Sequence, residues 1–456
     1  MVGTSKLALA AALAVAPAAL GTEAVRGEVD RLVASIAAAR HLTYHGTLPV
    51  QVVDRAEAAR QAERLNDQAD ADPAARSDAE LLRRLGLLAP PRDEGDVPGA
   101  SPRFDAVTGR LWVPSFVPIE TQKVALAHEV AHAVADQRFS FRRLMEIAPD
   151  GRSRLSGDAR RARLAVVEGD AMLTGLELLD PRENFLGAHE LSALAGRLRA
   201  AGGDPAGGWT AALAGFTHVD GLLFVARARA HHPWHTVDAL WTDPPSSTEQ
   251  ILHPEKYESC EAPVTLEPSA LPALPGLGTP AATDVAGELV IRAWLATAWA
   301  PEVAARAATG WGGDRVALYG AAPAASTPDG GVAPAALSWL TVWDDPGEAE
   351  DFARTARVVL QRLAEKDAHG DTGEDASEAS RPDGVVFSSP GGLFGLARRG
   401  EAVALLVAAP EGAEPALEAM LNAVRRGAEA SRRPASRPRP AALPGCLRRD
   451  RAGGSE

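Results

Sequence analysis

Cysteine is scarce in this chain, since only Cys260 and Cys446 occur among its 456 residues. Two cysteines are too few for a Cys-rich zinc ribbon. In an exported protein they would suffice for one disulfide bond, and the sequence leaves open whether they form it or remain two unpaired thiols. At this length the chain can bury a substantial hydrophobic core and form two or three domains.

Positive charge is also in deficit. The chain carries 47 Lys and Arg against 60 Asp and Glu, a formal net charge of -13. This balance argues against nucleic acid or an anionic membrane as the main partner. The exception is the basic, Pro-rich C-terminus, and we expect residues 431–456 to form a disordered basic tail.

Long apolar runs are absent except at residues 7–20, which follow Lys6 and contain only apolar residues. A single basic residue, a short apolar run and the A-x-A-like Ala16-Pro17-Ala18 predict a secretory signal peptide at residues 1–21. An uncleaved anchor is the alternative. We therefore expect a secreted, periplasmic or cell-envelope protein with no membrane span beyond the signal segment.

The most informative stretch is residues 121–138, which contains His128-Glu129-Val130-Ala131-His132 among small apolar residues. Residues four apart on a helix lie one turn above each other, so a helix here directs both imidazoles toward one point. Glu129 lies beside them, offset around the helix. This HExxH pattern predicts a zinc site with Glu129 as general base. The alternative is a surface helix with two solvated histidines.

A third ligand is expected from a second helix at residues 163–179, where Glu168 emerges on an apolar face. A buried carboxylate requires a cation nearby. Two imidazoles and this carboxylate would hold Zn2+ and leave its fourth position open, as in catalytic zinc sites. Alternatively, an arginine such as Arg161 or Arg163 neutralises Glu168.

These two segments together carry a resemblance. His128-Glu-x-x-His132, followed by a helix with Glu168-Gly-Asp-Ala171, resembles the gluzincin metallopeptidases. Residues 126–137 (LAHEVAHAVADQ), 167–171 (VEGDA) and 247–257 (STEQILHPEKY) more closely resemble a family of largely uncharacterised, secreted bacterial gluzincin-like proteins. The interval from His132 to Glu168 is longer than in thermolysin-like enzymes, and Met172 stands where those enzymes have an aspartate. The resemblance thus identifies the ligands better than their supporting residues.

The resemblance implies further roles around the zinc site. In several zinc peptidases a loop His or Tyr donates a hydrogen bond to the oxyanion, a role that His253 or Tyr257 would fill here. The alternative is that this segment only supports the metal helices. A strand at residues 111–113 would form a sheet edge that pairs with the substrate backbone, unless it belongs to a plain structural hairpin.

Two further carboxylates lie close to the expected ligands in sequence. Asp136 follows His132 by four residues, and Asp170 follows Glu168 by two. Each could accept a hydrogen bond from a ligand imidazole and fix its tautomer. Each could equally be an ordinary polar residue near a helix end.

The whole pattern predicts an α+β protein. A mainly helical, zincin-like catalytic domain with a small sheet is expected at residues 25–260, a Pro-rich linker at 261–283, and a smaller α+β sandwich domain at 284–430. Because every proposed ligand precedes the linker, a chain truncated near Pro263 should fold and bind one zinc ion. A polar, acidic loop is expected at residues 367–383. The C-terminal elements expected are helices at 285–308, 346–366 and 414–428 and strands at 315–321, 337–343, 385–387, 393–397 and 401–408.

The function predicted from these observations is a secreted zinc-dependent metallopeptidase that acts on a peptide or protein substrate. Zn2+ would bind His128, His132 and Glu168, and Glu129 would serve as general base. The rival hypothesis is a catalytically silent, zinc-stabilised binding or scaffold protein of the cell envelope.

The signal peptide gives the first testable prediction. Mass spectrometry of the native protein should find a mature N-terminus between about Ala19 and Val25, because the small residues that end the apolar run suit a signal peptidase. Recovery of the intact Met1 end from the cytosol would contradict export.

Overall fold

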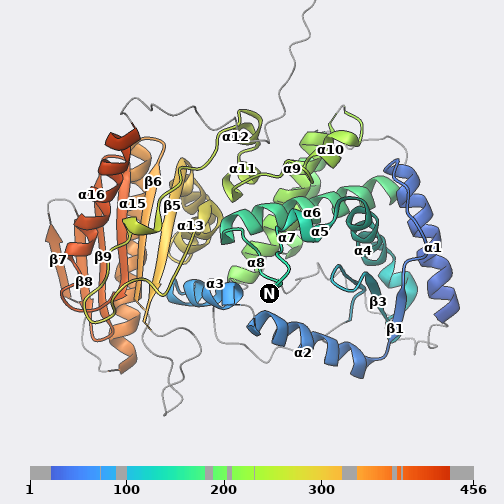
Figure 1. Cartoon of the computed structure of the whole chain (residues 1–456), viewed down its shortest axis with the longest axis horizontal. Helices are drawn as coiled ribbons and strands as arrows, with labels where there is room; N and C mark the ends of the chain where they lie inside the picture. The colour runs from blue at the N-terminus through green and yellow to red at the C-terminus, as the bar shows by residue number, and fades with distance from the viewer. Residues whose placement is uncertain are drawn as a thin grey trace, which may run out of the picture.

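The computed structural model describes residues 22–71, 73–88, 100–179, 188–202, 208–230, 232–320, 336–371, 377–381 and 384–431. The predicted signal peptide, the predicted tail from residue 432 onward and Cys446 lie outside these residues. Cys260 is disulfide-bonded. The predicted fold class is confirmed, since a mainly helical N-terminal region with a small sheet precedes a sheet-rich C-terminal domain (Figure 1).

The N-terminal region consists mostly of helices around a buried pair, α4 and α6. Small apolar residues allow α4 to pack closely on its neighbours, and Val130, Ala131 and Val134 are all buried in one cluster with α1. The helix ends at Phe139 because Ser140 adopts a positive φ of 67°. The helices are α1 (Thr22–Ala39), α2 (Arg55–Ala71), α3 (Pro73–Arg84), α4 (Ile119–Phe139), α5 (Phe141–Leu144), α6 (Gly157–Leu179), α7 (Ala188–Gly202), α8 (Gly208–Ala214), the π-helical turn η2 (Gly215–Asp220), α9 (Gly221–Arg229), α10 (His235–Ala239), α11 (Thr248–Leu252) and α12 (Pro254–Glu258).

A three-stranded sheet lies beside α4, and its strand order corrects one prediction. The strands β1 (Val50–Val53), β2 (Arg103–Asp105) and β3 (Arg110–Pro114) are arranged in the order β1-β3-β2. Residues 111–113 therefore lie in the central strand and offer no edge to a substrate. β1 pairs in parallel with β3 across nearly sixty residues of sequence, a non-local contact that the local pattern cannot reveal. The outer strand next to α4 is β2.

The C-terminal domain is built on a seven-stranded antiparallel sheet in the order β4-β5-β6-β10-β9-β8-β7. Successive side chains of a strand point to opposite faces of the sheet. Those of the central strands are buried on both faces. In β10, Val403, Leu405 and Val407 face the core shared with α15, whereas Ala404 and Leu406 face the core under α16. The elements are η3 (Pro268–Ala270), β4 (Ala282–Asp284), α13 (Gly287–Ala296), α14 (Pro301–Ala308), β5 (Trp311–Tyr319), β6 (Ala336–Trp343), α15 (Pro346–Asp371), β7 (Ser377–Arg381), β8 (Gly384–Ser389), β9 (Gly392–Arg399), β10 (Ala402–Ala409) and α16 (Pro415–Ser431).

Three details of this domain differ from the prediction. The single helix expected at residues 285–308 is two helices, because the chain leaves the helical conformation at Ala300 and restarts with Pro301 in the first turn of α14. β4 begins within the expected linker and ends one residue beyond it, at Asp284. β7 lies within the expected acidic loop at residues 367–383, where it pairs with β8 as the outermost strand.

The hydrophobic core runs through both parts of the chain. One buried cluster includes Leu81, Val166 and Leu222 of the helical region together with Trp294 and Trp339 of the sheet-rich domain. α13 lies between the seven-stranded sheet and α6 (Figure 1). The proposed domain boundaries stay predictions, but a chain truncated near Pro263 would expose this shared core. We therefore no longer expect such a fragment to fold alone.

The predicted linker also packs as part of the fold. The backbone N–H of Val264 donates to the carbonyl of Gly312 at the start of β5, at 2.7 Å. Leu266, Leu271 and Leu274 are buried in the core under α16. The Pro-rich composition of residues 261–283 thus reflects an irregular but anchored connection.

Two buried carboxyl groups lie where the helical region meets the sheet-rich domain. Asp158 at the start of α6 accepts hydrogen bonds from the backbone N–H and the hydroxyl of Thr248, at 3.0 and 2.6 Å. Asp314 of β5 accepts from the N–H groups of Ala286 and Gly287. Burial raises the pKa of Asp158 to about 8 and that of Asp314 to about 6, and hydrogen bonding offsets only part of this effect.

This burial predicts a stability that depends on pH. Asp158 binds its proton more tightly in the folded chain than in the unfolded chain, where its pKa is near the ordinary 3.8. The contribution of Asp158 to the free energy of unfolding is fully present below pH 3.8. It is lost progressively as the pH rises toward about 8. Asp158→Asn cannot ionise, so its melting temperature should fall less than that of the wild type between pH 5 and pH 8.

Thermal melts at both pH values check this expectation, with Asp150→Asn at an exposed position as the control. A pH profile of Asp158→Asn that coincides with the wild-type profile would show that Asp158 does not remain protonated in the folded chain.

Candidate metal centre

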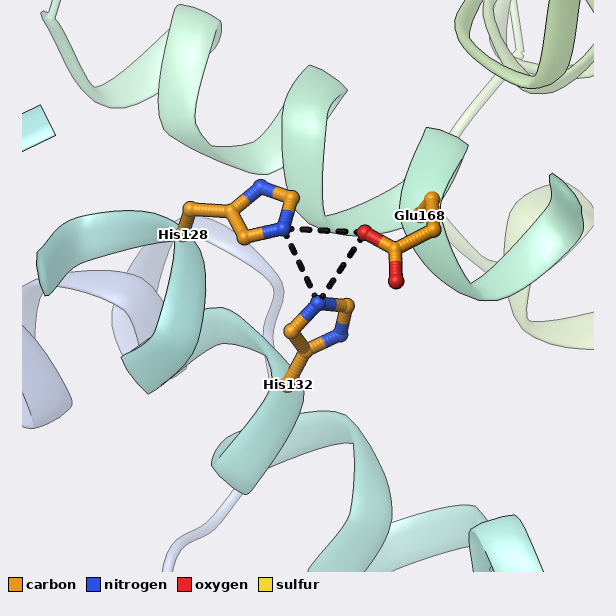
Figure 2. A group of neighbouring side chains, drawn as sticks. All are labelled: His128, His132 and Glu168. Carbon is orange, nitrogen blue, oxygen red and sulfur yellow. Dashed lines mark hydrogen bonds and ion pairs between the residues drawn. The ribbon is translucent and has the colours of Figure 1, made fainter. Parts of the chain in front are cut away.

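The helices α4 and α6 bring together the three ligand residues expected from the sequence. The Nε2 atoms of His128 and His132 lie 3.0 Å apart. Glu168 Oε2 lies 3.1 Å from the His128 nitrogen and 3.5 Å from that of His132. Figure 2 shows the three side chains pointing toward one another. All three ligand atoms lie within 4.8 Å of one another.

The electrostatics of this cluster depend on the buried carboxylate of Glu168. Burial alone would raise its pKa, but the imidazoles of His132 and His128 outweigh that effect and hold the pKa of Glu168 well below its ordinary value. For His132 burial favours the neutral ring, but the negative charge and hydrogen bond of Glu168 exceed this effect and raise the pKa of His132. The carboxylate thus retains its negative charge and attracts positive charge to the site.

The three residues suit a divalent metal ion. Two neutral imidazole nitrogens and a carboxylate oxygen all present lone pairs, and such atoms repel one another at 3.0–3.5 Å unless a proton or a metal ion lies between them. Nitrogen and oxygen ligands of this kind are typical of zinc. The cluster can therefore hold Zn2+ through His128, His132 and Glu168.

Glu129 lies beside this cluster without belonging to it. The residue is buried, and its Oε2 accepts a hydrogen bond from the backbone N–H of Phe104 in β2, at 2.7 Å. Its charge contributes to the raised pKa of His132, which places it close to the imidazoles. The HExxH helix thus presents two converging histidines and one adjacent carboxylate that is bonded to the sheet.

The structure adds one residue that the sequence analysis did not assign. His218 lies in η2, and its Nε2 is 3.4 Å from Glu168 Oε2. Its ring stacks on that of His128 with centroids 6.1 Å apart and an interplanar angle of 18°. Burial lowers the pKa of His218 despite the nearby carboxylate. The HExxH spacing gives no indication of His218, because the distance between His218 and Glu168 depends on how η2 packs against α6.

His253 and Tyr257 do not belong to the group formed by His128, His132 and Glu168, and both side chains bond elsewhere, so their catalytic role stays a prediction. The His253 Nε2 lies 3.1 Å from the buried carboxylate of Glu288 in α13. The Tyr257 hydroxyl donates to the carbonyl of Asp243 at 2.7 Å, and its ring packs on Phe224. The alternative reading, in which this segment is a support, fits these contacts because they join the helical region to the sheet-rich domain.

The two predicted supporting carboxylates bond elsewhere as well. Asp136 accepts from the backbone N–H of Phe141 at 2.6 Å, which holds the start of α5, and its carboxylate also interacts electrostatically with His132. Asp170 accepts from Arg40 and from the indole N–H of Trp241, the latter at 2.8 Å. Two residues turn a helix by about 200°, which directs Asp170 away from the face that carries Glu168.

A second acidic cluster already contains its cation. Glu249, Glu261 and Asp344 place carboxylate oxygens within 4.8 Å of one another. The ammonium group of Lys256 contacts all three, at 2.7, 2.7 and 2.6 Å. This cluster therefore links α11, α12 and the end of β6 through a lysine and does not resemble a metal site.

The helical run Gly208–Arg229 is long and apolar enough to cross a membrane by length and composition alone. However, 56% of its most apolar window is buried inside the molecule, and Phe216, Leu222 and Val225 belong to the main hydrophobic core. It is thus a core helix that carries His218 to the cluster.

Comparison with known proteins covers only the C-terminal domain. A model for a domain of unknown function (DUF8575) matches residues 276–421, which form most of the seven-stranded sheet and its helices. No curated protein and no solved structure matches the chain. These comparisons therefore leave the metal cluster without a relative of established activity.

The cluster predicts a specific effect of replacing its carboxylate. Glu168→Ala should weaken zinc binding and reduce the melting temperature of the zinc-loaded protein, because metal that binds the folded chain adds to its stability. Competition with a chelating dye and thermal melts with added zinc measure both effects. The matched control is Glu177→Ala on the same helix, where the carboxylate pairs with Arg229. Equal zinc affinity in Glu168→Ala and the wild type would exclude Glu168 as a ligand.

Proposed function

We propose that this chain is a secreted zinc-dependent metallopeptidase. The observation that carries the proposal is the convergence of His128, His132 and Glu168, with Glu129 fixed beside them. Two histidines and a glutamate are the protein ligands of catalytic zinc in thermolysin and carboxypeptidase A. A carboxylate next to such a site is the usual general base for peptide hydrolysis.

The chemistry divides between the metal and the protein. A zinc ion at this site would polarise a substrate carbonyl and lower the pKa of water to about 7. Glu129 would accept the proton of the attacking water and pass it to the leaving amine. The hydrogen bond from Phe104 holds the Glu129 carboxylate in place, so its orientation does not depend on the substrate.

The outer edge of β2 is the proposed place for the substrate backbone. Leu111 directs its N–H toward β1, where it donates to Pro49 at 2.9 Å. Its partner in β2, Phe104, therefore directs its own N–H away from β3 and toward Glu129. A peptide that lies along this edge would be next to the proposed base, and it would pair with the carbonyl of Phe104 because the N–H of Phe104 is bonded to Glu129.

The rival hypothesis is a zinc-stabilised scaffold with no chemistry. A structural zinc site is closed by its protein ligands and gains nothing from contact with solvent. Here the side chains of His128 and His132 remain 16% and 14% exposed. This partial exposure favours an enzyme, because a substrate must reach the metal.

The proposed location outside the cytoplasm rests on the sequence of residues 1–21 and on one structural observation. Cys260 is disulfide-bonded, and disulfides persist mainly in oxidising compartments.

The general base gives the direct test of the proposal. Glu129→Gln keeps the size of the side chain but cannot accept a proton, so peptide hydrolysis should fall by roughly two to four orders of magnitude. Zinc content should stay near that of the wild type, because Glu129 is not one of the three converging ligands. A peptide-library digest with purified protein, run with and without a chelator, measures the activity.

The matched control is Glu120→Gln, which changes an exposed glutamate of the same helix that pairs with Lys123. It should alter neither zinc content nor hydrolysis. A chelator-sensitive activity that survives Glu129→Gln would contradict the mechanism. If the wild type cleaves no peptide while it binds zinc, the scaffold hypothesis would be favoured instead.

A further inference from the structure

His218 lies at the border of the metal cluster without belonging to it. Its Nε2 is 3.4 Å from Glu168 Oε2, and its ring stacks on that of His128. Among the described residues, the group at this site whose ligand atoms all lie within 4.8 Å of one another consists of His128, His132 and Glu168. Two ligands of one tetrahedral zinc ion lie about 3.4 Å apart, given bond lengths near 2.1 Å. His218 is therefore too far from at least one histidine nitrogen to bind the same ion, and it leaves the fourth position open.

The backbone around His218 departs from regular geometry. The helical run Gly208–Arg229 is interrupted by η2, Gly215–Asp220, a π-helical turn that contains His218. A π turn inserts an extra residue into a helix and shifts the side chains on that turn relative to a regular α-helix. Such turns occur frequently at functional sites. η2 thus presents His218 to the cluster from an element other than α4 and α6.

Two glycines allow the helical run after η2 to approach α6 at backbone contact. A Cβ atom at Gly221 would overlap the carbonyl of Ala165, and one at Gly169 would overlap the carbonyl of Gly221. Gly169 directly follows Glu168, and Gly221 follows His218 by three residues. The contact of the two backbones therefore determines the distance between the His218 ring and the Glu168 carboxylate.

The hydrogen bonds of His218 determine which ring nitrogen carries the proton. Its Nδ1 lies 3.1 Å from the carbonyl oxygen of Ala214, which can only accept a hydrogen bond. The hydroxyl of Thr217, 3.0 Å from the same nitrogen, can accept as well. Nδ1 therefore carries the proton, and Nε2 presents a lone pair.

That lone pair has no donor among the described residues. The polar atom that faces it is Glu168 Oε2, which is another acceptor. A largely buried acceptor without a donor costs free energy. The His218 side chain is 13% exposed, much like those of His128 and His132 at 16% and 14%. The donor for Nε2 therefore comes from solvent or from a molecule bound beside the metal cluster.

We propose that His218 is a substrate-binding residue whose Nε2 accepts a hydrogen bond from a peptide N–H group, an inference that rests on the proposed function. The edge of β2 makes the same demand, because the N–H of Phe104 is bonded to Glu129 and its carbonyl is left for a substrate. Both groups are acceptors, so both select a molecule that offers N–H donors. An extended peptide meets this demand, because its N–H groups point alternately to its two sides.

The polarity of His218 differs from that of an oxyanion donor. The resemblance to zinc peptidases implies a His or Tyr that donates a hydrogen bond to the oxyanion. An unprotonated Nε2 instead repels a negatively charged oxygen. His218 therefore orients the substrate through an N–H group and does not stabilise the oxyanion.

The test compares two zinc-binding probes that differ in one N–H group. Acetohydroxamic acid has this group, and N-methylacetohydroxamic acid carries a methyl group in its place, while both bind zinc through two oxygen atoms. Calorimetric titration of the zinc-loaded, full-length protein gives both dissociation constants. The wild type should prefer the N–H probe, and this preference should fall by roughly 3- to 10-fold in His218→Ala, the net worth of one neutral hydrogen bond. His232→Ala, at an exposed histidine, is the control and should keep the wild-type preference.

Two further readouts do not depend on the probes. Zinc affinity should stay near that of the wild type in His218→Ala, because His218 is not one of the converging ligands. In the nitrogen NMR spectrum of the zinc-loaded wild type, the two ring signals that are missing from His218→Ala should be those of a protonated Nδ1 and an unprotonated Nε2.

An equal preference in His218→Ala and the wild type, or a protonated Nε2, would overturn the inference and leave the zinc site of the proposed function intact. A loss of zinc affinity in His218→Ala would also overturn it, because His218 would then support the metal instead of the substrate. A wild type that binds no zinc would overturn both this inference and the proposed function. If His218→Ala does not fold, His218→Phe supplies the same comparisons, because it keeps a planar ring but has no acceptor.

Discussion

The buried carboxylate of Glu168 is the constraint on which the N-terminal region depends. A carboxylate inside a protein is costly unless cations or hydrogen-bond donors surround it. Here three imidazoles, those of His128, His132 and His218, lie within 3.5 Å of one carboxylate oxygen. They come from two different elements, α4 and η2. The packing of α4 and η2 against α6 therefore depends on the negative charge of the Glu168 carboxylate.

That coupling extends through the core to the C-terminal domain. Asp158 in the first turn of α6 bonds through its buried carboxyl group to Thr248, and the hydrophobic cluster around α6 continues into α13 and the seven-stranded sheet. The STEQILHPEKY segment serves this junction through Lys256 and His253 instead of serving the catalytic centre. The C-terminal domain is thus joined to the helical region by a shared core and polar contacts, not by a flexible tether.

The sequence predicted that His128 and His132 converge because their spacing is local. A period of four residues on a helix places His128 above His132, and an isolated glutamate on an apolar helix face indicates a buried cation site. It could not predict that β3 is a central strand, since the partner β1 is distant in sequence. His218 was missed for a similar reason, because its role depends on a π turn and on two helices that touch through glycines. For His253 and Tyr257 the motif resemblance could not predict their bonds to Glu288 and to the carbonyl of Asp243.

The central claim is that this cluster is a metal site within the folded protein. The most direct measurement is the metal content of the purified full-length chain, combined with thermal melts before and after chelation. We expect one zinc ion per chain and a lower melting temperature after its removal, restored by adding zinc. A chain without bound divalent metal, whose melting temperature changes with neither chelator nor zinc, would contradict it.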